Sequence, residues 1–312
     1  MRALRAMVLA LGLVVPPARP AEPEGTLRFA WPVRGDATIE LSDERSVGDE
    51  RRSVVIEMHL RVEPDSTSDR LVLRFSDARI VSVDNVPIAS VNPAGMRIAV
   101  ARVMRIATPT ILVDRDGRYA ESRDLDGVAR GVLAAAGFPG MPPGLDSFKN
   151  LLRDVASGDW YAWVGAWLGS RQKPGEWTRT ESAWELDGTR VPVKATRRGL
   201  SSSGAAGRTR LEAAAVYPSE SVRRYTGGFL IDMAREAREL GDGDTVASTR
   251  FLEHAQFSPV TETLTVDLET ATMRPILAER TRTFSAVARG HWVSGSERRA
   301  HRFTWSPGSE PR

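Results

Sequence analysis

The sequence predicts an α+β protein: a curved antiparallel sheet, half-barrel-like, with a helical insert packed on it. Three observations predict this fold. Stretches of alternating polar and apolar residues, typical of half-buried strands, occupy both halves of the chain. Residues at about 124–168 follow a helical period instead. Strands and helices do not alternate one by one, which favours antiparallel pairing over βαβ units.

Strands are expected in the N-terminal half at residues 26–31, 38–41, 53–62, 70–84 and 110–113. Within 53–62 one face carries Ile56, Met58, Leu60 and Val62, and we expect this face to point inward. The step Asp116-Gly117 separates two extended runs, which predicts a hairpin because glycine supplies the positive φ of the turn.

The helical insert is expected to contain three helices, at residues 125–136, 147–156 and 159–168. Extended character then returns at 176–186 and 190–196, around a second Asp-Gly step, and at 208–216. A further helix is expected at 222–240, followed by strands at 261–268, 273–284 and 298–305.

The first 21 residues have the order of a secretory signal peptide: Arg2 and Arg5, an apolar run at 6–15, then prolines and small residues. The apolar run is far shorter than the roughly 20 residues that cross a bilayer, so no transmembrane span is expected. The sequence therefore predicts a periplasmic or secreted protein in which residues 22–312 form a single β-rich domain. The chain has no cysteine, which excludes disulfides, lipidation on cysteine and a thiolate nucleophile.

The charge pattern does not favour nucleic-acid binding. The net charge is only +3, and the 43 basic residues are scattered among 40 acidic ones. We therefore expect the arginines to form solvated ion pairs on the surface.

No residues are expected to be catalytic, to bind metal or to hold a cofactor. The four histidines, His59, His254, His291 and His301, never occur at the spacing of a helical zinc pair, and we expect them to be exposed on strands. Ser170 and Lys173 match the Ser-x-x-Lys pattern of penicillin-binding serine enzymes, but no Lys-Thr-Gly triplet accompanies them. A serine hydrolase is therefore kept as an alternative only.

Tryptophan is concentrated in one region. Trp160, Trp163 and Trp167 share one helical face, and Trp177 and Trp184 lie on the next strand. This pattern is typical of a buried core under a helix. It is also typical of an apolar cleft, which inward strand residues such as Met58 and Leu60 would help to line. Contact with a membrane surface is a third interpretation.

Two short segments resemble known exported proteins. Residues 266–275 form a strand, a turn and a returning strand that contains Arg274-Pro275, and the C-terminal strand ends in Phe303-Thr304-Trp305. These features resemble half-barrel envelope proteins of the lipoprotein-carrier and sigma-regulator class, and uncharacterised secreted β-rich bacterial proteins. The resemblance implies a concave sheet that holds an apolar ligand or a lipidated partner under helices, with no catalytic residue.

The sequence thus leads to an expected function and, besides the serine hydrolase, one further alternative. The expected function is an exported, non-enzymatic binding protein that holds an apolar small molecule or a lipidated protein in a cleft formed by Trp160, Trp163, Trp167, Trp177, Trp184, Met58 and Leu60. The alternative is an envelope structural or interaction protein in which the same tryptophans are core.

Overall fold

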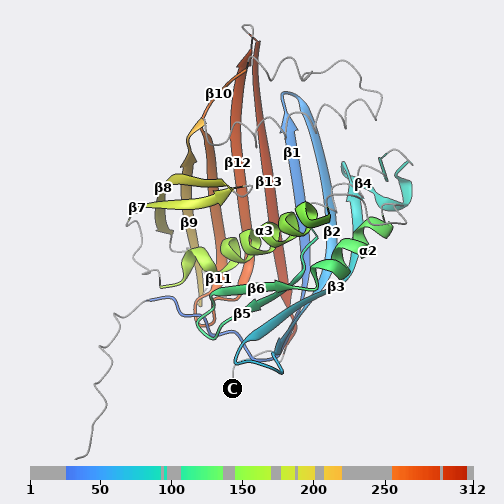
Figure 1. The fold of residues 1–312 in the computed structure, drawn as a ribbon, viewed down its shortest axis with the longest axis vertical. Helices are drawn as coiled ribbons and strands as arrows, with labels where there is room; N and C mark the ends of the chain where they lie inside the picture. Colours follow the sequence, from blue (N-terminus) through green and yellow to red (C-terminus); the bar gives the residue numbers. More distant parts are fainter. Residues whose placement is uncertain are drawn as a thin grey trace, which may run out of the picture.

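The computed structural model contains one large, open, curved antiparallel sheet crossed by helices (Figure 1). The structure describes residues 26–92, 95–96, 107–135, 145–169, 177–186, 189–200, 207–219, 255–288 and 291–307. The strand order along the sheet is β6-β5-β3-β2-β1-β13-β12-β11-β9-β8-β7, with β4 paired to β3 and β10 paired to β12. This architecture confirms the predicted fold class.

The N-terminal half of the sheet contains β1 (Gly35–Val47), β2 (Glu50–Pro64), β3 (Leu71–Val83), β4 (Val86–Pro87), β5 (Thr110–Val113) and β6 (Tyr119–Arg123). The C-terminal half contains β7 (Trp177–Leu186), β8 (Thr189–Leu200), β9 (Arg208–Tyr217), β10 (Gln256–Phe257), β11 (Val260–Glu269), β12 (Pro275–Ala288) and β13 (His291–Trp305). The helices are η1 (Ile88–Ser90), α2 (Leu125–Ala135), α3 (Leu145–Trp163) and η2 (Gly165–Trp167).

The two halves meet where the first long strand pairs with the last one. Ala37 of β1 lies opposite Trp305 of β13, and the pairing continues to Val47 opposite Gly295. The remaining strands extend outward from this central pair, so β6 and β7 form the two edges of the sheet. Because α2 and α3 follow β6 and precede β7 in the chain, the helical insert links one edge of the sheet to the other. Figure 1 shows α3 running across the central strands.

The predicted strand faces and hairpins are confirmed. Ile56, Met58, Leu60 and Val62 are all buried in the core, as expected for the inward face of β2. The two Asp-Gly steps lie between β5 and β6 and between β7 and β8.

The start of the chain and the helices differ from prediction. Residues 27–31 form no strand, but Leu27 and Trp31 are buried, and the Trp31 indole donates a hydrogen bond to the Met273 carbonyl (3.2 Å). The segment is held by these side chains and by single backbone hydrogen bonds, such as that from the Ala30 N–H to the Thr272 carbonyl at 3.1 Å, and not by a strand ladder. The second and third predicted helices are one helix, α3, which continues through Gly158 and ends at Trp163 before the short turn η2. The predicted signal peptide and the predicted helix at 222–240 lie outside the described residues.

Within the described residues, no helix combines the length and the hydropathy needed to cross a membrane.

Candidate functional site

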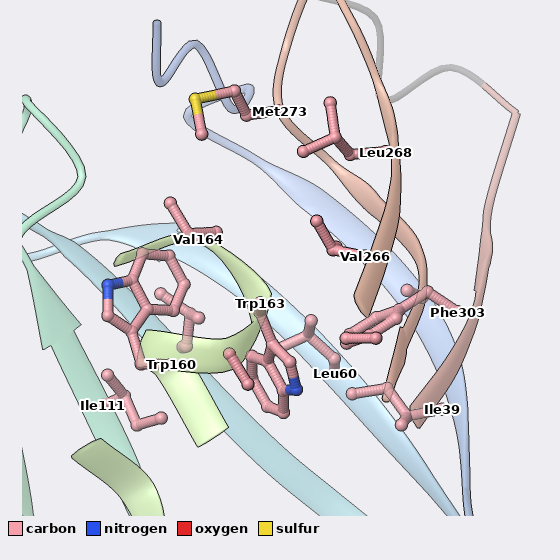
Figure 2. Packing of buried hydrophobic residues seen from close by; sticks show 14 of the residues in the cluster. Ile39, Leu60, Ile111, Trp160, Trp163, Val164, Val266, Leu268, Met273 and Phe303 are labelled. Carbon is pink, nitrogen blue, oxygen red and sulfur yellow. The ribbon is translucent and has the colours of Figure 1, made fainter. Parts of the chain in front are cut away.

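The C-terminal end of α3 carries aromatic side chains onto the inner face of the sheet. Trp160 and Trp163 lie on the last turns of α3 and Trp167 lies on η2, and each is only 1% exposed. Figure 2 shows Trp160 and Trp163 facing apolar side chains of the sheet. These sheet residues come from five strands: Ile39, Met58, Leu60, Ile111, Val266, Leu268 and Phe303. We call this set, together with the three tryptophans, the tryptophan cluster.

The rings of the tryptophan cluster meet mainly edge to face, which suits the quadrupoles of aromatic rings. The centroid of Trp163 lies 5.2 Å from that of Phe303 and 5.0 Å from that of His301. The centroid of Trp160 lies 5.3 Å from that of Trp31. These contacts hold the end of α3 against β13 and the N-terminal segment.

The three indole N–H groups are not equally satisfied. Trp160 donates to the Gly117 carbonyl at 3.0 Å, and Trp167 donates to the Ala162 carbonyl at 2.8 Å. The buried N–H of Trp163 has no acceptor among the described residues. A buried donor without an acceptor loses its hydrogen bonds to water and gains none in the protein, which costs free energy. The Trp163 N–H is therefore an unsatisfied polar group inside an apolar cluster.

The structure brings together five of the seven predicted site residues. Trp160, Trp163, Trp167, Met58 and Leu60 all belong to one buried cluster. Trp177 and Trp184 lie on β7, the edge strand of the C-terminal half, where they pair with Arg198 and Val191 of β8. The side chains of β7 lie outside the described part of the structure, so a contact of these two tryptophans with a ligand stays a prediction. Ligand contact by the other five also stays a prediction.

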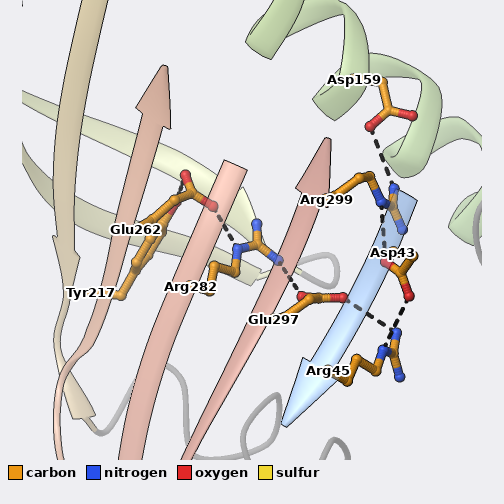
Figure 3. A network of polar contacts seen from close by, with 8 residues as sticks. All are labelled: Asp43, Arg45, Asp159, Tyr217, Glu262, Arg282, Glu297 and Arg299. Atoms are coloured by element: carbon orange, nitrogen blue, oxygen red, sulfur yellow. Dashed lines mark hydrogen bonds and ion pairs between the residues drawn. The ribbon is translucent and has the colours of Figure 1, made fainter. Parts of the chain in front are cut away.

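A second site on the inner face was missed at the sequence level: a network of buried charges beside the tryptophan cluster (Figure 3). It consists of Asp43 and Arg45 on β1, Asp159 on α3, Glu262 on β11, Arg282 on β12, and Glu297 and Arg299 on β13, with Tyr217 of β9 at its end. We call it the charge network. Its members alternate in sign across four neighbouring strands, which is the arrangement that stabilises cross-strand pairs.

One row of the charge network runs from β9 to β1. The Tyr217 hydroxyl donates to Glu262 at 2.9 Å, and Glu262 accepts from Nε of Arg282 at 2.5 Å. Arg282 also lies 3.8 Å from Glu297, which accepts a hydrogen bond from Arg45 at 3.2 Å.

A second row links the sheet to α3. Arg299 lies between two carboxylates, with Nε 3.5 Å from Asp43 and Nη1 3.4 Å from Asp159. His301 Nε2 lies 3.6 Å from the other oxygen of Asp159. Asp159 therefore joins α3 to β13 by charge, one helical turn before Trp163 joins it by packing.

The surrounding cations keep Asp159, Glu262 and Glu297 of the charge network ionised. Burial acts to raise the pKa of Asp159, but His301 and Arg299 outweigh it and hold that pKa well below its usual range. Burial likewise acts against ionisation of Glu297, and Arg45 and Arg282 hold its pKa well below the usual range. Burial together with the charge of Glu262 raises the pKa of Tyr217, so this phenol remains a neutral donor.

The expectation that the arginines form solvated surface pairs is wrong for Arg45 and Arg299, which are 6% and 4% exposed. The alternation of inward and outward positions along the strands could have predicted this burial. On β1, alternate positions carry Ile39, Leu41, Asp43 and Arg45. These residues share the inward face, which is therefore apolar at one end of the strand and charged at the other. Glu297, Arg299, His301 and Phe303 show the same pattern on β13.

The histidine expectation is correct for His59, which is exposed, and wrong for His301, which is 3% exposed. His301 is buried because it follows the inward parity of β13 and packs on Trp163. His254, Ser170 and Lys173 lie outside the described residues, and so does the side chain of His291. Among the residues that the structure describes, no group of histidine and acidic side chains could hold a metal ion.

No family model matches the chain, and no curated protein matches it. Among solved structures, it is similar to lipovitellin, described as showing lipid-protein interactions, with a TM-score of 0.41 and 9% identity over 90% of this chain. The match spans about a quarter, 26%, of the lipovitellin chain. A DUF1329 family protein from Desulfovibrio piger gives a TM-score of 0.13 and 10% identity, covering 88% of this chain and 86% of the other. At these TM-scores neither likeness informs the ligand of this chain.

Proposed function

We propose that this protein is an exported, non-enzymatic binding protein that holds an apolar small molecule or a lipidated partner between α3 and the inner face of the sheet. Trp160, Trp163, Trp167, Met58 and Leu60 line this site in the proposal. Export rests on the signal-peptide pattern of the first 21 residues. The binding role rests on the fold and on the tryptophan cluster.

The proposal rests mainly on one observation: α3 crosses the inner face of an open sheet (Figure 1) and packs on it through apolar and aromatic side chains. Along the chain, the helical insert follows one edge strand of the sheet, β6, and precedes the other, β7. An apolar molecule that enters beneath α3 would exchange one apolar contact for another, at little cost in buried surface. It would also offer the unmatched N–H of Trp163 an acceptor, if it carries a carbonyl or ester oxygen.

The alternative is a structural or interaction protein of the envelope in which α3 never leaves the sheet. The exposure of only 1% at Trp160, Trp163 and Trp167 favours it. The two functions differ in one measurable respect, because only the first requires the tryptophan cluster to accept a foreign molecule.

The test is a titration of delipidated protein with N-phenyl-1-naphthylamine, a neutral apolar dye that becomes fluorescent in apolar surroundings. The proposal predicts saturable binding, energy transfer from tryptophan to the dye, and displacement by fatty-acyl compounds. Trp163→Phe should weaken displacement by acyl esters, because it removes the N–H and keeps an aromatic ring.

Trp292→Phe is the matched control, because Trp292 is 65% exposed on β13 and lies outside the tryptophan cluster. It should bind the dye as the wild type does. A folded wild-type protein that shows neither saturable dye binding nor energy transfer would favour the structural alternative.

A further inference from the structure

Arg280 occupies an unusual place on the inner face of β12. On the same face its neighbours along the strand are Ala278 and Arg282, and directly across lie Leu264 of β11 and Arg299 of β13. None of these four nearest positions is acidic. The side chain is half-buried, and its charge is therefore only partly screened by water.

Each carboxylate near Arg280 is paired with a different arginine. Glu262 pairs with Arg282 at 2.5 Å, and Asp159 pairs with Arg299 at 3.4 Å. Glu297 pairs with Arg45 at 3.2 Å. Within the described residues, Arg280 itself has no hydrogen bond or ion pair, although the charges of Glu262 and Glu297 act on it from further away.

Two like charges directly opposite each other on neighbouring strands destabilise a sheet, and Arg280 and Arg299 form such a pair. Burial first, and then repulsion from Arg282 and Arg299, lowers the pKa of Arg280. The position of Arg280 thus favours a negative group beside it.

α3 passes close over Arg280 and leaves part of its side chain exposed beside the helix. The residue of α3 that faces it is Gly158, and a Cβ at that position would lie 3.4 Å from Nη1 of Arg280. Any larger side chain at position 158 would occupy the space next to the guanidinium. Asp159 and Trp163 follow on the same helix, so Arg280 lies where the charge network meets the tryptophan cluster.

We propose that Arg280 binds the anionic head group, a carboxylate or a phosphate monoester, of an amphiphile whose apolar chain contacts the tryptophan cluster. This inference rests on the proposed function and specifies its ligand class as an acidic amphiphile. A guanidinium binds either anion through two parallel N–H donors, whereas a neutral head group would leave Arg280 without a counter-charge. The apolar chain provides most of the affinity, and the head group provides the selectivity for acidic over neutral amphiphiles.

The test compares oleate, oleyl phosphate and oleyl alcohol as competitors of N-phenyl-1-naphthylamine, with acetate and inorganic phosphate as free-anion arms. We expect the wild type to bind the two acids about tenfold or more tightly than the alcohol, and the free anions not to displace the dye. Arg280→Gln should remove the preference for the acids and leave the affinity for oleyl alcohol unchanged. Because it also removes a repulsion, this variant should melt at or above the Tm of the wild type.

Arg298→Gln is the matched control. Arg298 adjoins Arg299 on β13 but points to the outer face of the sheet, where its side chain is 41% exposed and pairs with Glu44 and Glu279. It should retain the preference for the acids. Equal binding of the acids and the alcohol by the wild type would overturn the role of Arg280 and leave the proposed function intact. Absence of any displacement, with no dye binding, would overturn both. Displacement by acetate or phosphate alone would show a free-anion site and overturn the amphiphile assignment.

Discussion

Asp159 shows how one carboxylate can fix a helix to a sheet. Its side chain is 2% exposed and lies between Arg299 and His301, so its ionised form stabilises the contact between α3 and β13. Removing one partner from a buried ion pair leaves the other charge uncompensated, which typically costs about 3 to 5 kcal/mol. We expect Asp159→Asn to lower the free energy of unfolding by about 3 kcal/mol at pH 7.

The same carboxylate gives a prediction for pH. The folded-state pKa of Asp159 is lowered, so its contribution is complete above the unfolded pKa of about 4 and is lost progressively as the pH falls from there through the lowered folded-state pKa. Urea unfolding at pH 7 and at about pH 2 should show a large loss for the wild type and a smaller one for Asp159→Asn. Glu40→Gln, at a side chain 56% exposed and 3.9 Å from Arg302, should keep the wild-type dependence. Identical losses in the wild type and Asp159→Asn would contradict the role of Asp159.

Trp163 gives the residue-scale prediction for the tryptophan cluster. Truncating a buried tryptophan removes its contacts and leaves a cavity, so Trp163→Ala should cost about 3 to 5 kcal/mol of unfolding free energy. Trp292→Ala should change it by less than about 0.5 kcal/mol, because that ring is exposed. Chemical denaturation of both variants tests the difference, and equal effects would show that the end of α3 does not depend on Trp163.

At the scale of elements, the hairpin between β5 and β6 depends on close approach as well as on backbone conformation. Gly117 has φ +81°, and a Cβ there would lie 2.5 Å from the ring of Phe29. Gly48, in the turn between β1 and β2, has φ +58° with open space around it. We therefore expect Gly117→Ala to destabilise the protein by more than about 1 kcal/mol, and by clearly more than Gly48→Ala. Thermal melting of both variants checks this, and equal shifts would exclude a role for the contact with Phe29.

The elements that could be predicted from the sequence are those whose signal is local. Alternation along residues 53–62 predicted the inward face of β2 correctly, and the Asp-Gly steps predicted two hairpins, because each depends on a few adjacent residues. The division of α3 into two helices was wrong because tertiary packing of Trp160 and Trp163 maintains the helix through Gly158. The pairing of β1 with β13 lies beyond local reasoning, since its partners are far apart in the chain.

The candidate site could be predicted only in part for the same reason. The tryptophans stood out through their spacing on one helix face. The charge network did not, because its members come from strands that only the sheet brings together. In the register of β1 and β13, Asp43 lies opposite Arg299 and Arg45 lies opposite Glu297. In the sequence alone, each of these residues looks like an ordinary surface charge.

At the scale of the whole molecule, β13 unites the two halves of the sheet through its pairings with β1 and β12. A proline in a central strand removes a hydrogen bond from the sheet, so Ala300→Pro should destabilise both halves together. Ala120→Pro is the matched control, because Ala120 lies at the register shift of the edge strand β6, where Val113 pairs with Tyr119 and Leu112 with Glu121. Circular dichroism melting should show loss of the strand signal for Ala300→Pro and near wild-type melting for Ala120→Pro. Retention of one folded half in Ala300→Pro would contradict the continuity of the sheet.

The inner face carries an apolar zone, the tryptophan cluster, and a charged zone, the charge network, and side chains of α3 contact both. Trp163 faces the first zone, and Asp159 and Gly158 face the second. An acidic amphiphile has the same division, with an apolar chain and a charged head. This correspondence connects the fold to the proposed function.

Native mass spectrometry of the protein purified from an exporting host, followed by denaturation and lipid extraction, tests whether the inner face holds an acidic amphiphile. We expect a co-purifying amphiphile with an acidic head group, at up to one molecule per chain, which is lost on denaturation. A folded protein that is empty from the host and remains empty after incubation with oleate would contradict amphiphile binding, and the tryptophan cluster would then be core alone.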